Sequence, residues 1–177
     1  SSKIKKLQGG KKLETFPVRK FEQKGNLPKI SLLATGGTIA SRIDYQTGAV
    51  HMAFKPEEFF FAVPQLGELI SFKSIKELSN ISSEDLYYKN WQQMAIETAK
   101  ELNAGSRAVI ITHGTDTMHF SSAALSFMLQ NLSGPIIFTG AQRSSDRGSS
   151  DTVLNLICSI YFKFQKTIIH DAMLTFS

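Results

Sequence analysis

Short apolar runs alternate along this chain with longer stretches that have the residue pattern of helices. The runs at 30–34 (ISLLA), 108–112 (AVIIT) and 136–139 (IIFT) are too short for helices and are typical of strands buried on both faces. Strands and helices that alternate in this way build βαβ units, which form a parallel sheet covered on both sides. The predicted fold class is therefore α/β: an open, doubly wound, mostly parallel sheet with helices on both faces.

The other expected elements complete this alternation. Further strands are expected at 70–78 and 167–175. A helix is expected at 56–66, where a proline and two acidic residues stand at the start. Three more helices are expected at 84–102, 119–132 and 151–164.

The charge of the chain is concentrated at its N-terminal end. The formal net charge is +5, yet residues 1–30 hold nine Lys and Arg against two Glu, whereas the other 147 residues hold 11 against 13. We assign 1–28 as a basic linker or arm and 29–177 as an α/β domain. Two interpretations of the arm stay open: a solvated linker, or a segment that touches an anionic partner such as RNA.

The composition excludes several other classes of protein. The chain has 177 residues, of which 42% are hydrophobic and 20% charged, as in an ordinary globular domain. Its single cysteine excludes a disulfide scaffold. No apolar run reaches the ~18–20 residues of a membrane-spanning helix, and the lysine-rich N-terminus is unlike a signal peptide. We expect a cytoplasmic protein with no membrane partner. Because the chain begins with Ser1, we also expect it to lie within a longer or processed protein.

Three loops follow expected strands, and ligands of open α/β sheets bind beyond the carboxyl ends of the strands. The first loop, 35–41, holds the paired glycines Gly36 and Gly37, which allow the backbone to approach a ligand closely or to form an anion nest. It matches neither nucleotide-binding glycine motif. The third loop, 140–150, is polar. Its arginines either pair with Asp146 and Asp151 or face a carboxylate or phosphate.

The second loop, 112–119, holds a carboxylate between two threonines at the end of a strand. Asp116 either caps the following helix or binds a substrate ammonium group beside a hydroxyl nucleophile or relay. His113 is expected to be a structural hydrogen-bonding residue, and with no second histidine nearby we expect no metal site.

The three loops together resemble the asparaginase/glutaminase family of amidohydrolases. The matching segments are ATGGTIAS at 34–41, ITHGTDTM at 111–118 and GAQRSSDR at 140–147. Longer segments at 27–50, 112–129 and 140–151 are similar to one branch of that family, the GatD subunits of the archaeal glutamyl-tRNA(Gln) amidotransferases. The resemblance spans roughly residues 27–158 and implies the asparaginase-like N-terminal α/β domain.

The resemblance implies a role for each matching residue. Thr38 matches the nucleophilic threonine, Tyr45 a tyrosine on the loop that closes over it, and Thr115 with Asp116 the second catalytic threonine and its aspartate. Ser83 matches a residue that grips the substrate α-carboxylate. Glu84 stands where free asparaginases usually have Gln, which fits the GatD branch. The substrate-binding residues implied are Gly37, Ser83, Glu84 and Gly114.

The implied activity is release of ammonia from glutamine or asparagine. A GatE-like partner subunit would use it to convert Glu-tRNA(Gln) to Gln-tRNA(Gln), with tRNA(Gln) bound through the complex and with a homodimer of this subunit. ATP and Mg²⁺ are expected on the partner, and no cofactor or metal in this chain. Two alternatives stay open: a free cytosolic L-asparaginase, and a non-catalytic anion- or RNA-binding α/β domain.

The resemblance also implies a proton-relay lysine beyond the strand expected at 167–175. No residue of this sequence matches it, because Lys163 and Lys166 fall before that strand, on the wrong side of the sheet. We therefore expect the domain to be truncated or disrupted at its C-terminal end. The 177-residue chain alone is expected to have little or no asparaginase or glutaminase activity, so a catalytically dead truncated fragment is a further alternative.

Overall fold

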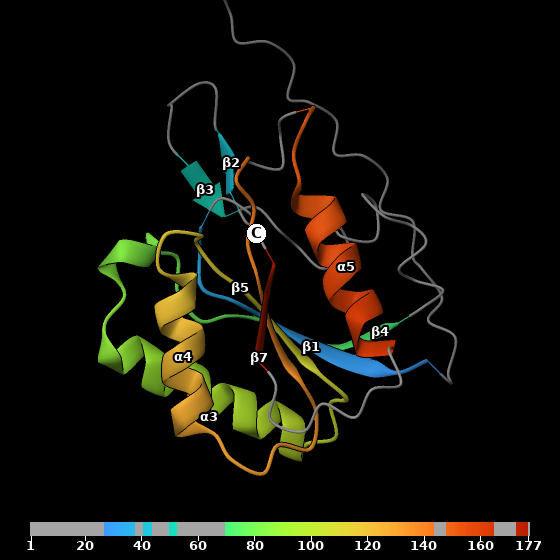
Figure 1. Ribbon diagram of the computed structural model, residues 1–177. Coiled ribbons are helices and arrows are strands. Elements are labelled where there is room, and N and C mark those ends of the chain that lie inside the picture. The colour runs from blue at the N-terminus through green and yellow to red at the C-terminus, as the bar shows by residue number, and fades with distance from the viewer. Residues whose placement is uncertain are drawn as a thin grey trace, which may run out of the picture.

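A parallel sheet organises the part of the chain that the computed structural model describes, residues 27–37, 41–43, 50–52, 70–143, 148–164 and 173–176. Five described strands pair in the order β4-β1-β5-β6-β7, all parallel (Figure 1). Their bounds are β1 Lys29–Ala34, β4 Ser71–Glu77, β5 Val109–Thr112, β6 Ile136–Thr139 and β7 Met173–Phe176. The short strands β2 (Ser41–Ile43) and β3 (Val50–Met52) form a separate antiparallel pair.

Helices cover both faces of the sheet, and each face has its own apolar cluster. Helices α3 (Tyr88–Asn103) and α4 (Met118–Met128) lie on one face, and α5 (Thr152–Phe164) lies on the other (Figure 1). Side chains of β5 alternate between the two clusters: Ile110 packs with α5, whereas Ile111 packs with α3 and α4. The predicted fold class, a doubly wound α/β sheet, is confirmed. None of the described helices is long and apolar enough to cross a membrane.

The sheet has a topological switch point between β1 and β5. These two strands are hydrogen-bonded neighbours, but the chain leads from β1 to β4 on one side and from β5 to β6 on the other. Loops that leave neighbouring strands in opposite directions open a crevice beyond the strand ends. Two of the three loops predicted to carry chemistry therefore border this crevice.

The helix predicted at 84–102 begins later than expected. Ser83–Asp85 form a separate turn of 3-10 helix, and the backbone at Leu86 and Tyr87 is extended before α3 begins at Tyr88. The side chain of Asn90 accepts a hydrogen bond from the Tyr87 N–H at 3.1 Å and so closes the helix start. Ser83 therefore lies in this separate turn and is not part of α3.

The helix predicted at 119–132 is shorter than expected. It ends at Met128, and Leu129 has extended dihedral angles (φ −118°, ψ 126°). Leu129 and Leu132 pack against the apolar cluster under α3 and α4, so apolar burial after the helix end produces the same pattern as continued helix. The last strand, predicted at 167–175, is observed at Met173–Phe176. The helix expected at 56–66 lies outside the described residues.

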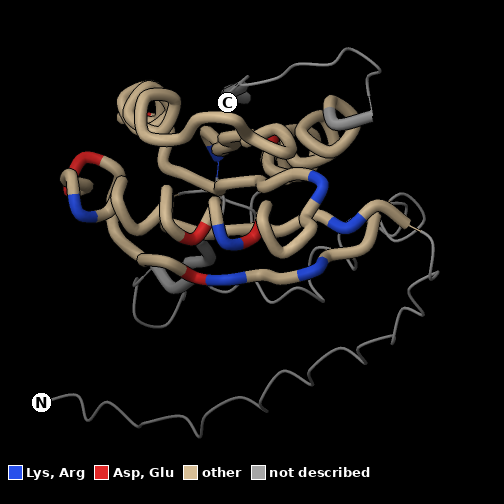
Figure 2. Tube along the Cα trace, turned by 90° about the horizontal axis from the view of Figure 1, so that it is seen from below, with Lys and Arg blue, Asp and Glu red and all other residues tan. Residues whose placement is uncertain are grey.

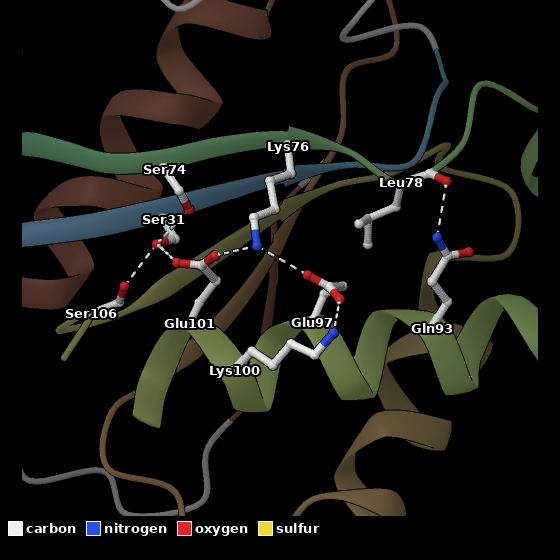
Figure 3. Close-up of polar contacts among 9 residues, drawn as sticks. All are labelled: Ser31, Ser74, Lys76, Leu78, Gln93, Glu97, Lys100, Glu101 and Ser106. Atoms are coloured by element: carbon white, nitrogen blue, oxygen red, sulfur yellow. Dashed lines mark hydrogen bonds and ion pairs between the residues drawn. The ribbon is translucent and has the colours of Figure 1, made fainter. Parts of the chain in front are cut away.

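A partly buried polar network fixes the C-terminal half of α3 to the sheet (Figure 3). Ser31 Oγ of β1 donates to Glu101 Oε2 at 2.7 Å, and Lys76 Nζ of β4 lies 2.7 Å from Glu101 Oε1. Burial alone would raise the pKa of Glu101, but the hydrogen bonds from Lys76, Ser31 and Ser74 outweigh it and lower that pKa to about 2. Figure 2 shows charged residues of both signs distributed over the described chain. Lys76 of β4 pairs with Glu97 and Glu101 of α3 (Figure 3).

Candidate active site

The loop that follows β1 is held between the loops that follow its two neighbouring strands. Thr35 donates from its hydroxyl to the Thr112 carbonyl at 2.9 Å, which joins this loop to the end of β5. Ser79 donates from its hydroxyl to the Thr35 carbonyl at 2.8 Å, which joins it to the segment after β4. Thr35 is buried, so these bonds lie in the interior and position the glycine turn that comes next.

Gly37 brings the first loop into backbone contact with the second. Its φ is +81°, a conformation that L side chains rarely adopt. A Cβ built at Gly37 would lie 2.6 Å from the amide nitrogen of Gly114, so any side chain there would displace one loop. The close approach seen here is to the neighbouring backbone; the predicted approach of this loop to a ligand stays a prediction.

Ser83 also lies against the second loop. A Cβ built at Gly114 would lie 2.7 Å from Ser83 Cβ and 2.8 Å from Ser83 Oγ. Thr117 donates from its hydroxyl to the Ser83 carbonyl at 2.7 Å. The segments after β1, β4 and β5 therefore meet at Gly114, and the four residues predicted to bind substrate lie on these segments.

Asp116 does not cap the helix that follows it. The N-cap of α4 is Thr117, one residue further along, and in the described part of the chain no N–H of α4 donates to the Asp116 carboxylate. Asp116 is exposed and Thr115 partly exposed, at the end of a strand whose own residues are buried. Of the two interpretations of Asp116, the helix start gives the capping role no support, and the binding of a substrate ammonium group stays a prediction.

Glu84 adds a second carboxylate beside Ser83. Ser83 Oγ donates to Glu84 Oε2 at 3.4 Å. The pKa of Glu84 is lowered, first by a hydrogen bond from its own backbone N–H and then by one from the Ser82 hydroxyl. Glu84 is therefore negatively charged near neutral pH. Its role toward a substrate, like that of Asp116, stays a prediction.

His113 is a buried hydrogen-bonding residue, as predicted. Its Nδ1 lies 2.7 Å from the Gly114 carbonyl oxygen, and its Nε2 lies 2.7 Å from Ser121 Oγ. Burial lowers the pKa of His113, and the bond to Gly114 only partly opposes this, so the ring is neutral near pH 7. Among the described residues, no three His, Cys, Asp or Glu side chains are grouped so that they could hold a metal ion.

In the third loop, where the arginines are expected either to pair with Asp146 and Asp151 or to face an anion, the Asp151 side chain binds backbone groups. The Asp151 carboxylate accepts hydrogen bonds from the backbone N–H groups of Gln142 (3.0 Å) and Arg143 (3.1 Å). The Arg143 guanidinium donates instead to Ser149. A carboxylate satisfies loop N–H groups here because these donors would otherwise have no strand or helix partner. Asp146 and Arg147 lie outside the described residues.

Two of the predicted catalytic residues, Thr38 and Tyr45, also lie outside the described residues, so their roles stay predictions. Residues that the loop motifs did not single out are Ser121 and Trp91, which extend the hydrogen bonding of His113 from helices α4 and α3. The residue pattern of a helix does not indicate which of its polar side chains will contact a neighbouring loop. Only the fold places them together.

The chain belongs to the asparaginase family. Residues 29–177 match the family model described as "Asparaginase, N-terminal". A crystal structure of a probable cytoplasmic L-asparaginase from Campylobacter jejuni has a TM-score of 0.74 at 30% sequence identity and covers 84% of this chain and 45% of its own. The family resemblance of the three loops is thereby confirmed.

Within that family the chain is similar to one kind of subunit, the GatD subunit of glutamyl-tRNA(Gln) amidotransferase. The GatD subunit from Pyrococcus furiosus is 57% identical over 139 residues, which cover 78% of this chain and 32% of that relative. The GatD subunit from Methanosarcina mazei is 47% identical over 153 residues, 85% of this chain and 36% of the relative. The chain thus spans about a third of the length of these curated relatives.

Proposed function

We propose that this chain carries the amide-hydrolysing site of a tRNA-dependent amidotransferase subunit, which releases ammonia from glutamine or asparagine for a partner subunit. The observation that carries the proposal is that the segments of Gly37 and Ser83 both lie against Gly114, two residues before Asp116. Similarity to a GatD subunit at 57% identity favours the amidotransferase over a free enzyme. The structural likeness to an L-asparaginase keeps free asparaginase activity as the second candidate.

The substrate is bound in this proposal by its α-amino acid group. The Ser83 hydroxyl holds the α-carboxylate, and the carboxylates of Asp116 and Glu84 hold the ammonium group, each through charge-assisted hydrogen bonds. Gly37 and Gly114 allow the backbone to approach the substrate, because no side chain intervenes at either position. This arrangement directs the side-chain amide of the substrate toward Thr38 and Thr115.

The reaction is nucleophilic displacement of ammonia at an amide carbon. The Thr38 hydroxyl attacks that carbon, its proton passes to a base, and the backbone N–H groups of the glycine-rich loops stabilise the oxyanion. The C–N bond then breaks, the nitrogen leaves as ammonia after taking up a proton, and water hydrolyses the acyl-threonine. Tyr45 closes over this centre, and Thr115 takes part in proton transfer.

The product ammonia passes to a GatE-like partner that amidates glutamate on tRNA(Gln). Activation of that glutamate carboxylate, with ATP and Mg²⁺, belongs to the partner, and this chain needs no cofactor for its own step. A homodimer of this subunit within the complex is part of the same proposal.

Ammonia release from glutamine and from asparagine, measured in the intact protein with and without its partner and glutamyl-tRNA(Gln), tests the proposal. We expect release from glutamine that increases when the partner and the tRNA are present. Release from asparagine alone, independent of both, would establish the free asparaginase instead. No release under any condition would exclude both candidates.

A further inference from the structure

Side chains from α3, from α4 and from the loop after β5 form a hydrogen-bond chain that ends on the loop of Thr115 and Asp116; His113 and Ser121 are buried and Trp91 is partly buried. Trp91 Nε1 of α3 donates to Ser121 Oγ of α4 at 2.9 Å. Ser121 Oγ lies 2.7 Å from His113 Nε2, and His113 Nδ1 lies 2.7 Å from the Gly114 carbonyl oxygen. His113 and Ser121 are both 0% exposed, so water does not compete for these groups.

The chemistry of the groups joined by these hydrogen bonds determines which group donates in each bond. A carbonyl oxygen only accepts, so His113 Nδ1 must carry the proton that it shares with Gly114. The neutral ring then has a lone pair on Nε2, which requires the Ser121 hydroxyl to donate. Ser121 Oγ accepts in turn from Trp91, whose indole nitrogen only donates. Each group is satisfied in a single arrangement, running from Trp91 through Ser121 and His113 to Gly114.

The last bond of the chain fixes the plane of the peptide between Gly114 and Thr115. In a trans peptide the C=O and N–H point in opposite directions. A carbonyl held toward the His113 ring therefore aims the Thr115 N–H away from it and restricts where Thr115 and Asp116 lie. Gly114 needs this restraint because glycine has more backbone freedom than any other residue. The His113 ring is itself held edge-on to Phe138 of β6, with 5.8 Å between ring centroids.

We propose that Trp91, Ser121 and His113 form a positioning device that holds the Gly114–Thr115 peptide, and through it Thr115 and Asp116, in the geometry that binds and hydrolyses the amide substrate. His113 works in this device as the Nδ1–H tautomer and exchanges no proton with the substrate. The inference rests on the proposed function for its kinetic consequence, whereas the hydrogen-bond chain itself is independent of that function.

Two substitutions at His113 separate the two ends of its ring. In His113→Asn the amide nitrogen takes the place of Nδ1 and keeps a donor for Gly114, but the acceptor for Ser121 is lost. In His113→Gln the amide oxygen reaches the place of Nε2 and keeps an acceptor for Ser121, but the donor for Gly114 is lost. Both variants remove the ring from its contact with Phe138, so they share the loss of packing.

The experiment measures the kcat and KM of glutamine hydrolysis in the intact, assembled protein, together with the unfolding midpoint of each variant. We expect His113→Gln to raise KM or lower kcat by about tenfold or more, because small displacements of site groups cost this much. We expect His113→Asn, which keeps the donor for Gly114 but lacks the link to Ser121 and Trp91, to recover part of that loss, although both variants unfold at similar midpoints. Equal kinetic loss in the two variants, or wild-type kinetics in both, would overturn the positioning role.

A spectroscopic measurement tests the tautomer directly. Nitrogen-15 NMR of histidine-labelled protein, with His113→Asn used to identify the signal, should show a protonated Nδ1 and an unprotonated Nε2. An Nε2–H tautomer would contradict the proposed arrangement of hydrogen bonds from Trp91 to Gly114. If the wild type releases no ammonia at all, the proposed function fails, and the nitrogen signals still decide whether the hydrogen-bond chain exists.

Discussion

The hydroxyl of Thr117 donates a hydrogen bond to the backbone carbonyl of Ser83 at 2.7 Å, and this bond joins the start of α4 to the turn after β4. The two residues are 34 positions apart in the sequence. Thr117 follows Asp116 directly, and Ser83 precedes Glu84. The bond therefore fixes the separation between the two halves of the proposed amino-acid site.

Replacing Thr117 by Val should weaken this connection without changing the volume of the side chain much. We expect the free energy of unfolding to fall by about 1 kcal/mol, the usual net worth of one hydrogen bond. We also expect a higher KM for glutamine, because Ser83 and Asp116 would no longer be held at a fixed separation. Thr117→Ser is the matched control, since it keeps the hydroxyl, and its KM should stay close to that of the wild type. Equal KM values for both variants would disprove this role of the bond.

A single methyl group added at Gly114 should harm both stability and substrate binding. Its replacement by Ala would place a Cβ 2.7 Å from Ser83 Cβ, so the loops must separate. We expect a loss of stability of about 1–3 kcal/mol, typical of overpacking, and a markedly weaker binding of glutamine by calorimetry. The control is Gly148→Ala, where an added Cβ meets nothing within 4 Å and should change neither quantity. Normal glutamine affinity in Gly114→Ala would show that the close approach is not required for binding.

Asp116 is expected to bind the substrate ammonium group, because it is exposed beside Thr115 and does not cap α4. Asp116→Asn should weaken glutamine binding strongly, since a charge-assisted hydrogen bond becomes a neutral one. The fold should be unchanged, because an exposed side chain contributes little to packing. Titration calorimetry with glutamine measures the effect. An unchanged affinity would remove Asp116 from the binding site.

The network around Glu101 predicts how stability depends on pH. Its pKa is about 2 in the folded protein and near 4.5 when unfolded, so its contribution is fully present above about pH 4.5 and is lost as the pH falls toward 2. The size of that contribution is roughly 2–3 kcal/mol. In Glu101→Gln the difference in unfolding free energy between pH 7 and pH 3.5 should shrink. Glu77→Gln, which changes an exposed carboxylate at the end of β4, should keep most of the wild-type stability at pH 7. An unchanged pH dependence in Glu101→Gln would rule out this ionic contribution.

Residue patterns predicted the strands of this fold well because burial on both faces leaves a simple signature. The runs at 108–112 and 136–139 became β5 and β6, with every described residue of these strands buried. The starts and ends of helices were harder to predict. The start of α3 depends on a hydrogen bond to the Asn90 side chain, whereas the acidic residues Glu84 and Asp85 suggest an earlier start. Leu132 fits a helical pattern because it packs against the apolar cluster, although the helix has already ended.

The loops that form the site were predictable, but their mutual contacts were not. The rule that ligands bind beyond parallel strands selected the segments of Gly37 and Gly114 from the sequence alone. The bond between Thr117 and Ser83 depends on how two loops fold toward each other. The hydrogen-bond chain through Ser121 depends on the rotation of two helices, which no local pattern specifies.

The most direct measurement of the central claim is a crystal structure of the intact protein with bound glutamine. Thr38→Ala should be used, because loss of the nucleophile should abolish hydrolysis and preserve the bound substrate. We expect the α-carboxylate of glutamine within hydrogen-bond distance of Ser83 Oγ, and its ammonium group beside Asp116, in the crevice between the loops after β1 and β5. Glutamine bound elsewhere, with this crevice filled only by solvent, would contradict the account.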